Sequence, residues 1–150
     1  MRYAAIITKE GRRELAEFTD CPGCQTFAEP DERILDNARE ALEGWLESHL
    51  ARGLVPPRPS KRAPKLRGRV LWVAVPAKLG VKLVLRWARQ EAGLTQAELA
   101  KRAGVSQPMI AKLEHPDHNP TLETLEKVAH ALGSRLDVTM TRIQDEHAAH

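Results

Sequence analysis

The chain has 150 residues, enough for one ordinary domain or two small ones, and its 42% hydrophobic and 29% charged residues are typical of a soluble protein. No apolar run approaches the ~20 residues that span a bilayer, and no long apolar segment follows the N-terminus, so we expect neither a membrane helix nor a secretory signal. A cytoplasmic location, in which both cysteines stay reduced, is therefore the expectation.

The net charge of +3 is unevenly distributed along the chain. Residues 1–55 carry a net charge of −4, residues 56–69 a net charge of +6, and residues 70–150 a net charge of +1. An acidic front, a basic middle and a nearly neutral back indicate two modules with different partners.

The front of the chain has the pattern β-β-β-α-β. Strands are predicted at residues 3–8, 14–19 and 25–28, separated by turns that contain glycine or Pro-Gly. A helix opens at Pro30-Asp31 and ends at Gly53, and a fourth strand is predicted over residues 70–75. The helix carries one apolar stripe, formed by Ile34, Ala38, Ala41, Leu42, Trp45, Leu46 and His49. We therefore expect the helix to cover one face of the sheet.

A polar, basic connector joins the helix to the fourth strand. Four prolines interrupt any helix in this stretch. Its cationic residues are Arg58, Lys61, Arg62, Lys65, Arg67 and Arg69. Because the fourth strand belongs to the front sheet, the domain boundary is expected after residue 76, with domains at 1–76 and 77–143 and a polar tail at 144–150.

The back of the chain becomes helical at Ala77. The first helix is expected over residues 77–92. Thr95 and Glu98 form the pattern of a capping box at the start of the second helix, Ser106 caps the third, and Thr121 caps a fourth that ends at Gly133. Residues 135–143 alternate in polarity, which predicts a short C-terminal strand.

Residues 94–107 indicate two helices that cross at a tight turn. Leu99 and Ala100 face inward from the second helix, and Gly104 permits the turn. Val105 and Ile110 are expected to fill the space beneath the third helix. This arrangement is that of a helix-turn-helix.

The segment resembles the Xre-type, or lambda-repressor-like, helix-turn-helix family. The matching features are Arg89, the block Gly93-Leu94-Thr95-Gln96 followed by Glu98-Leu99-Ala100, the block Gly104-Val105-Ser106-Gln107, Leu113-Glu114, Thr124-Leu125 and the residues 129–133. The resemblance implies that the helix opening at Ser106 enters the major groove of operator DNA, and that Ser106 is itself one of the DNA-binding residues.

The resemblance also implies roles for single residues. Gln107 is the best base reader, because its amide can form two hydrogen bonds to adenine. Met109 is suited to a thymine methyl group, and Lys112 to a guanine or a phosphate. Gln96 and Asn119 are expected at phosphates, although Lys112 and Asn119 also suit a merely solvated surface.

Within the same family resemblance, Arg89 and Glu114 correspond to a structural ion pair.

The front module is similar to the HicB antitoxin family. The similarity rests on the strand at 3–8, the turn from Asp20 through Pro22-Gly23-Cys24, and the helical stretch Asn37-Ala38-Arg39-Glu40-Ala41-Leu42. Gly53, the segment 56–60 and a strand that ends in Val75-Pro76 follow in the expected order. Phe27-Ala28 departs from the family, which more often has a glycine-bearing turn there.

This resemblance implies an α+β protein, in which a partial ribonuclease-H-like module precedes the helix-turn-helix domain. It implies an antitoxin that binds a HicA-type mRNA-degrading toxin and represses its own operon by binding operator DNA. Since one helix-turn-helix reads a half-site, at least a homodimer is expected, and residues 135–143 are a candidate interface. No cofactor is expected. The alternative is a stand-alone regulator whose front module senses a small ligand.

Two further patterns are interpreted as structural. Cys21 and Cys24 form a C-x-x-C, but no helix N-terminus in a βαβ unit follows it, so we expect no redox role. His115 and His118 could add two ligands for zinc, but the spacing between them is shorter than in zinc fingers, and about 90 residues separate them from the cysteines. Asp20 is the single acidic residue near a suitable strand end, so metal-dependent nuclease chemistry, which needs several convergent carboxylates, is not expected.

Overall fold

The computed structural model describes residues 1–143, and the expected polar tail at 144–150 lies outside them. The chain divides into two compact units. The first contains Met1–His49 and Pro56–Pro76, and the second contains Ala77–Thr141 together with Leu50–Val55. The two units meet in the chain after Pro76, and the short segment Leu50–Val55 belongs with the second unit.

The first unit is built on an antiparallel sheet that, in the described part of the chain, has four strands in the order β3-β2-β1-β4. The bounds are Arg2–Glu10 for β1, Arg13–Phe18 for β2, Gln25–Ala28 for β3 and Arg69–Ala74 for β4. The central strand β1 pairs with β2 through Ala5 opposite Phe18, and with β4 through Ala5 opposite Leu71. The predicted strands are therefore all present, each within two residues of its expected ends.

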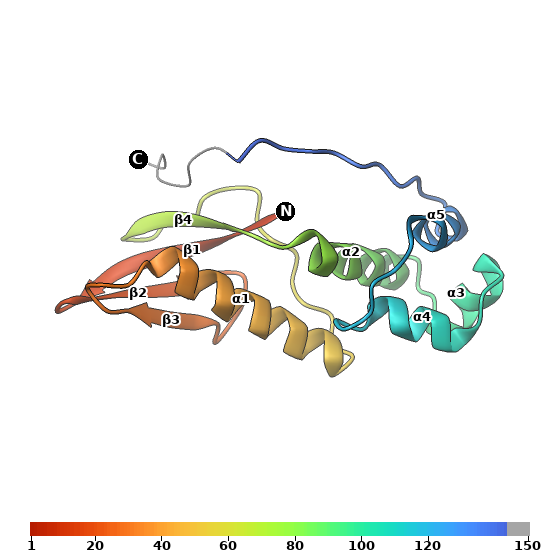
Figure 1. Ribbon diagram of the computed structural model, residues 1–150, viewed down its shortest axis with the longest axis horizontal. Helices are drawn as coiled ribbons and strands as arrows, with labels where there is room; N and C mark the ends of the chain where they lie inside the picture. The colour runs from red at the N-terminus through yellow and green to blue at the C-terminus, as the bar shows by residue number, and fades with distance from the viewer. Residues whose placement is uncertain (144–150) are drawn as a thin grey trace. The chain divides into compact units, whose positions relative to one another are not determined.

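One face of this sheet forms the core of the first unit. Residues that lie directly opposite each other in a ladder share a face, so Tyr3, Ala5 and Phe18 lie on the same side as Leu71 and Val73. All five are buried. Helix α1, Ile34–Ala51, lies along this sheet (Figure 1) and buries its own apolar stripe, including Ala38, Leu42 and Leu46. The expected cover of one sheet face by the helix is what the structure shows.

Helix α1 begins later than its sequence predicts. Glu32 explains the difference, because its carboxylate accepts hydrogen bonds from the backbone N–H of Glu29 at 2.9 Å and from Asn37 Nδ2 at 3.0 Å. These bonds hold residues 29–33 in turns rather than in a first helical turn. They also lower the pKa of the Glu32 carboxyl, through the Glu29 backbone bond first and the Asn37 bond second.

The second unit contains four helices among its described residues: α2 at Ala77–Glu91, α3 at Gln96–Ala103, α4 at Gln107–Glu114 and α5 at Leu122–Ala131. The capping box at α3 is present, since Thr95 Oγ1 accepts from Glu98 N and Glu98 Oε2 accepts from Thr95 N. Ser106 and Thr121 cap α4 and α5 through their side-chain oxygens. Each cap satisfies an N–H that the first helical turn would leave without a partner.

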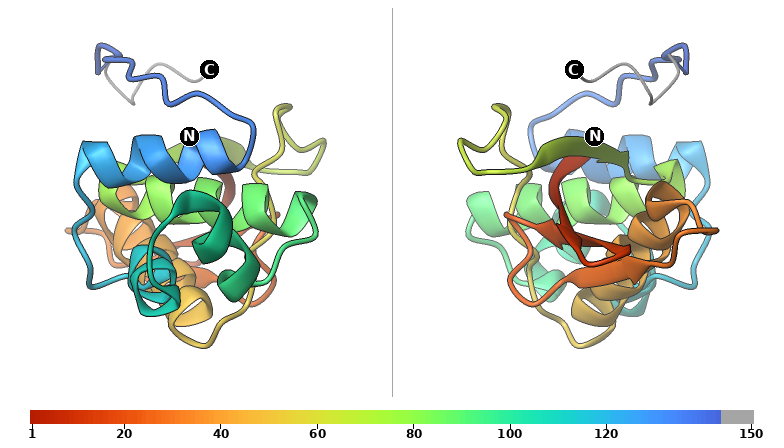
Figure 2. Two further views of the ribbon diagram at one scale, coloured as in Figure 1. Left: turned by 90° about the vertical axis from the view of Figure 1, so that its right-hand side faces the viewer. Right: turned by 90° about the vertical axis from the view of Figure 1, so that its left-hand side faces the viewer.

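The turn between α3 and α4 depends on Gly104. Its φ of 67° lies in the left-handed region, and its N–H donates to Ala100 O. Figure 2 shows that the helices of this unit do not all run in the same direction. They enclose a core of Leu85, Leu94, Leu99, Ala100, Ile110, Leu113, Leu125 and Val128. Val105 packs against this core, so the predicted helix-turn-helix arrangement is confirmed.

The prediction of a C-terminal strand over residues 135–143 is wrong for the described part of the chain. Residues 134–143 form no strand in the described chain, although Leu136 packs against the core of the second unit. The apolar residues of this alternation, Val138 and Met140, are 76% and 95% exposed, and Asp137 and Thr139 are exposed as well. A strand also needs a neighbour for its backbone hydrogen bonds, and within residues 1–143 this segment has none.

The α+β class is thus confirmed as a four-stranded sheet with one helix, followed by a helical unit, over the residues described. No helix within residues 1–143 is long and apolar enough to cross a bilayer.

Candidate nucleic-acid interface

The candidate interface is the N-terminal part of α4 with the start of α3 beside it. Ser106, Gln107 and Lys112 are exposed, Gln96 and Met109 are half-buried, and all come from α3, α4 or the turn between them. Asn119 is exposed in the loop that follows α4. The side chain of Ser106 is already used to cap α4, where its Oγ accepts from Met109 N at 3.3 Å.

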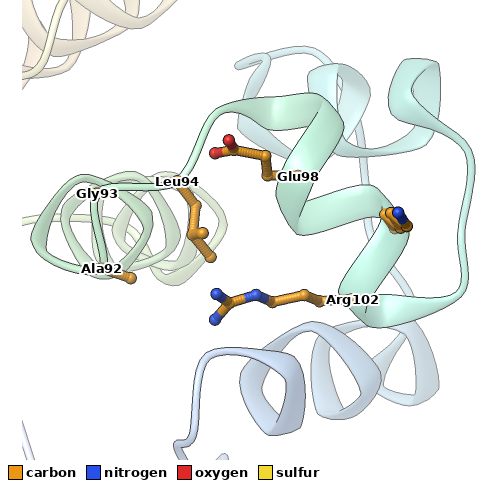
Figure 3. A pocket seen from close by; sticks show the side chains of 6 residues that line it. Ala92, Gly93, Leu94, Glu98 and Arg102 are labelled. Carbon is orange, nitrogen blue, oxygen red and sulfur yellow. The ribbon is translucent and has the colours of Figure 1, made fainter.

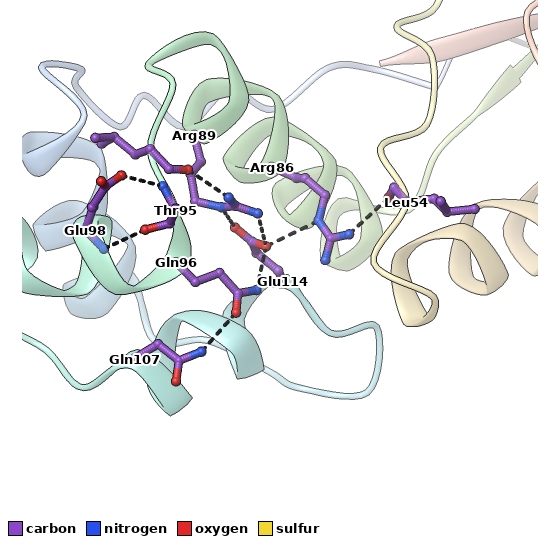
Figure 4. Close-up of polar contacts among 9 residues, drawn as sticks. Leu54, Arg86, Arg89, Thr95, Gln96, Glu98, Gln107 and Glu114 are labelled. Atoms are coloured by element: carbon purple, nitrogen blue, oxygen red, sulfur yellow. Dashed lines mark hydrogen bonds and ion pairs between the residues drawn. The ribbon is translucent and has the colours of Figure 1, made fainter.

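Two glutamines in this set contact each other. Gln107 Nε2 donates to Gln96 Oε1 at 3.2 Å, and Gln96 Nε2 donates to Glu114 Oε2 at 3.1 Å (Figure 4). A primary amide has two N–H donors and an oxygen with two lone pairs. Within the described residues, Gln107 therefore keeps one N–H and its oxygen unused, and Gln96 keeps one N–H. A free N–H and oxygen on one amide are what bidentate binding to adenine requires.

The glutamines rest on a buried ion pair. Glu114 is only 2% exposed at its side chain, and both of its oxygens accept from the Arg89 guanidinium, the Nη2 bond being 3.0 Å long. Arg89 Nη1 also donates to Leu94 O at 2.9 Å. A paired charge with this many hydrogen bonds is costly to disrupt, because removal of one partner leaves the other buried and unpaired. The pair predicted between Arg89 and Glu114 thus braces α2, α4 and the turn before α3.

Arg86 is a second arginine at the same carboxylate, and sequence reasoning missed it. Its Nε lies 3.3 Å from Glu114 Oε2, and its Nη1 donates to Leu54 O at 3.0 Å within the second unit. Burial lowers the pKa of Arg86, and the Glu114 carboxylate opposes this effect. One signal in the sequence could have indicated this contact. Arg86 and Arg89 are three residues apart, so they lie on the same face of a helix, and a carboxylate that pairs with Arg89 is also within reach of Arg86.

The loop that carries Asn119 is fastened by a buried lysine. Lys82, on α2, is fully buried and its Nζ donates to His118 O. Burial lowers the pKa of Lys82, with Lys78 adding to the effect and Asp117 opposing it. The pKa of His118 is lowered by desolvation and then by Lys82, Lys112 and Lys78. The loop therefore lies in a positively charged environment, which suits a nearby phosphate.

A separate hollow of about 690 Å³ lies at the junction of α2 and α3. Its lining comprises Ala92, Gly93, Leu94, Glu98, Lys101 and Arg102. Figure 3 shows Glu98 and Arg102 extending from α3 on the side of α2. Glu98 is committed to the capping box, and none of the six predicted DNA-contact residues lines the hollow.

The two cysteines are buried and free of a disulfide. Burial raises the pKa of Cys21 to about 12, with Cys24 and Asp20 adding to it, and burial raises that of Cys24 to about 11. The thiols are therefore protonated at neutral pH, whereas metal binding and redox exchange use the thiolate. Across residues 1–143, no cluster of three or more histidine, cysteine or acidic side chains could hold a metal ion.

Comparison with known proteins identifies the second unit. A helix-turn-helix family model matches residues 85–138. An uncharacterized HTH-type transcriptional regulator of Methanothermobacter thermautotrophicus is 42% identical over 53 residues, which is 35% of this chain and 77% of that protein. An uncharacterized HTH-type transcriptional regulator of Haemophilus influenzae is 41% identical over 58 residues, which is 39% of this chain and 59% of that protein.

A third relative covers both units. The protein named antitoxin HicB of Escherichia coli is 28% identical over 142 residues, which is 93% of this chain and 99% of the antitoxin. These relatives are regulators and antitoxins by name, in agreement with the prediction of a non-enzymatic protein. The chain belongs to the helix-turn-helix family of DNA-binding regulators through residues 85–138, and along 93% of its length it is similar to antitoxin HicB of Escherichia coli.

Proposed function

We propose that this protein is the antitoxin of a type II toxin–antitoxin pair, which binds and neutralises a HicA-type mRNA-degrading toxin and represses its own operon. The observation that carries the proposal is the extent of the HicB match. It covers 93% of this chain, which includes residues of both units, and spans 99% of the Escherichia coli antitoxin, whereas the matches to the two HTH-type regulators extend over only 58 and 53 residues.

The second unit supplies DNA binding in this proposal. Helix α4 enters the major groove with Gln107 at base edges and Met109 and Lys112 following it. The count of hydrogen-bond groups supports this role, because Gln107 retains an N–H and an oxygen after bonding to Gln96. Gln96 and Asn119 contact phosphates, and the lysines around His118 add positive charge beside them.

The first unit supplies toxin binding. We assign to it the partial ribonuclease-H-like fold of the HicB family, with no catalytic role. Residues 1–55 carry a net charge of −4, which favours association with a basic RNA-binding protein. Glutamates of α1 such as Glu40, Glu43 and Glu47 are candidates for this surface, although solvation of the helix face explains them equally well. The protein acts in the cytoplasm, where both messages and operator are found.

A homodimer or higher oligomer completes the proposal. One helix-turn-helix reads one half-site, so two copies are needed for a full operator. In the candidate interface at 135–143, Val138, Met140 and Ile143 are 76%, 95% and 90% exposed. Antiparallel pairing of this segment with that of a second copy would satisfy its backbone groups and bring Val138 and Met140 beside side chains of the second copy.

Growth rescue tests the proposal. The small reading frame beside this gene is expressed alone, with this chain, or with its Gln107→Ala variant. We expect growth arrest from the neighbour alone and rescue by both versions of the chain, because Gln107 is assigned to DNA and not to the toxin. Lack of a toxic neighbour, or lack of rescue, would contradict the antitoxin role and favour a stand-alone regulator that senses a small ligand.

A further inference from the structure

The basic loop, defined as residues 61–67, is a feature that the proposed function leaves without a role. It lies between α1 and β4 and contains Lys61, Arg62, Lys65 and Arg67 but no acidic residue. All four of these side chains belong to exposed residues. Figure 2 shows the segment that leads into β4 as a loop extending away from the sheet.

The loop is fixed to the sheet at its start. Ser60 donates two hydrogen bonds to Asp20, from its N–H to Oδ2 at 2.8 Å and from its Oγ to Oδ1 at 2.7 Å. Three residues earlier, Pro57 O accepts from Tyr3 Oη at 2.7 Å. The chain therefore enters the loop from a defined position on the first unit.

The loop is also fixed at its end. Gly68 has a φ of +129°, and a Cβ placed there would lie 2.6 Å from Ile6 Cγ2 and 2.8 Å from Ile7 O. Glycine is thus required for the close approach to β1. The next residue, Arg69, pairs with Ile7 in the ladder and forms an ion pair with Glu14 at 3.3 Å. With both ends held, the loop loses less backbone entropy on binding a ligand than a loop with free ends would.

The charges of the basic loop are not neutralised by the protein. Arg69, which follows the loop, forms an ion pair with Glu14. Within residues 1–143, no such pair is formed by the four cations of the loop, Lys61, Arg62, Lys65 and Arg67. Four like charges confined to seven residues repel one another, and a polyanion would relieve this repulsion. A row of arginine and lysine side chains without aromatic residues between them matches a phosphate backbone rather than stacked single-stranded bases.

We propose that the basic loop binds the phosphate backbone of the same duplex DNA that α4 reads; this inference rests on the proposed operator binding. The distance along the chain permits it. From Arg67 to Ala77, where α2 begins, the chain is 10 residues long and can span at most ~35 Å, about one turn of duplex DNA. Because α4 holds the duplex, the local concentration of phosphates near the loop is high.

The toxin is a poorer candidate for the basic loop. A partner that degrades RNA is expected to be basic, and like charges at an interface oppose binding. The acidic part of the first unit is the better surface for such a protein. The loop and the acidic surface would thus divide the first unit between DNA and toxin.

The salt dependence of DNA binding tests this inference, using the full-length protein. The probes are a duplex containing the DNA upstream of this gene and a shuffled duplex of the same length. The variants are Lys61→Ala with Arg62→Ala, Lys65→Ala with Arg67→Ala, and all four together. The matched control is Lys9→Ala with Arg12→Ala, two exposed cations at the β1–β2 turn whose removal changes the net charge as much as each pair does.

Each phosphate contact contributes about 0.9 to the slope of log affinity against log salt concentration. We expect each loop pair to reduce the slope by about one to two, and the fourfold variant by about two to four, on both duplexes. The control pair should retain the wild-type slope. Equal slopes for the loop pairs and the control pair would overturn the inference while leaving operator binding intact.

Two other outcomes are decisive. Loss of affinity for the neighbouring toxin or for single-stranded RNA, with an unchanged slope on duplex DNA, would assign the loop to that partner and overturn the inference. Failure of the wild-type protein to bind either duplex would overturn the proposed operator binding itself, and the inference with it. Circular dichroism spectra of all variants show whether the fold is retained.

Discussion

Gln107, at the start of α4, donates a hydrogen bond to Gln96 across the helix-turn-helix, with 3.2 Å between Nε2 and Oε1. Gln96 in turn donates to Glu114, whose side chain is 2% exposed. An exposed amide is therefore connected, through one intermediate residue, to the buried ion pair of the second unit. In the proposed DNA complex, these bonds would hold the Gln107 side chain in place before DNA binds, and so reduce the conformational entropy lost on binding.

Gln107→Ala is predicted to weaken binding to the DNA upstream of this gene by about 1–3 kcal/mol and to relax the preference for one base pair. Competition against duplexes with single base changes measures both effects. Equal weakening on every duplex would instead make Gln107 a phosphate contact.

Gln96→Ala is predicted to weaken binding without changing which base is preferred, because its spare N–H is assigned to a phosphate. Since the two glutamines are bonded, the double variant should lose less than the sum of the single losses, with a coupling energy of about 0.5–1.5 kcal/mol. Additive losses would show that the Gln96–Gln107 bond does not serve DNA binding.

Glu114→Gln is predicted to destabilise the protein by about 3–5 kcal/mol, because Arg86 and Arg89 would lose their shared counter-charge in a buried site. Urea unfolding measures the change. Glu123→Gln is the matched control, since the 82% exposed Glu123 side chain pairs with Lys127 at the surface, where such a pair contributes about 0–1 kcal/mol. Similar losses for both variants would refute the bracing role of Glu114.

Local signals explain why much of the second unit could be predicted from sequence. Thr95 and Glu98 are three residues apart, and both bonds of the capping box form within one helical turn, so no tertiary information is needed. The turn at Gly104 could also be predicted locally, because glycine adopts a left-handed backbone conformation without the steric cost that other residues have. The Arg89–Glu114 pair followed from a family pattern rather than from chemistry.

The missed features all depend on partners distant in sequence. Lys82 donates to His118, 36 residues away, and Arg86 donates to Leu54, 32 residues away, so neither burial was visible in the pattern of α2. The strand expected at 135–143 failed for the same reason. Its alternation defines two faces, but a strand exists only with a neighbour to accept and donate backbone bonds.

DNA affinity is predicted to increase as the pH falls below 6.5, the ordinary pKa of histidine, through His118. In the free protein the pKa of His118 is lowered by desolvation and by Lys82, Lys112 and Lys78. A bound phosphate offsets these lysines and raises the pKa, so binding takes up a proton. Titrations of wild type and His118→Gln over this range measure the effect, and superimposable pH profiles would contradict it.

The buried thiols are predicted to react with iodoacetamide only as the protein unfolds. Burial raises the pKa of Cys21 to about 12 and that of Cys24 to about 11, so both lack thiolate at pH 8. Their unfolded pKa is about 9.0, so the contribution of these thiols to stability is complete below pH 9 and declines as the pH rises through 11. Rapid alkylation of the folded protein would contradict the burial.

Met140→Asp is predicted to shift the protein toward the monomer, because Met140 is a 95% exposed apolar side chain of the candidate interface at 135–143. Thr141→Asp adds the same charge at the neighbouring exposed polar residue and should leave the oligomer intact. Light scattering after size-exclusion chromatography measures the mass. Equal masses for the two variants would exclude this segment as the interface.

Co-purification from cells that express both genes tests the antitoxin assignment most directly. The tagged full-length chain is isolated with whatever the adjacent reading frame encodes, and the complex is assayed for RNA cleavage before and after dissociation. We predict that a small basic protein co-elutes, is inactive in the complex, and cleaves RNA once released. A chain that elutes without the product of the adjacent frame, while that product is expressed and cleaves RNA unhindered, would contradict the assignment.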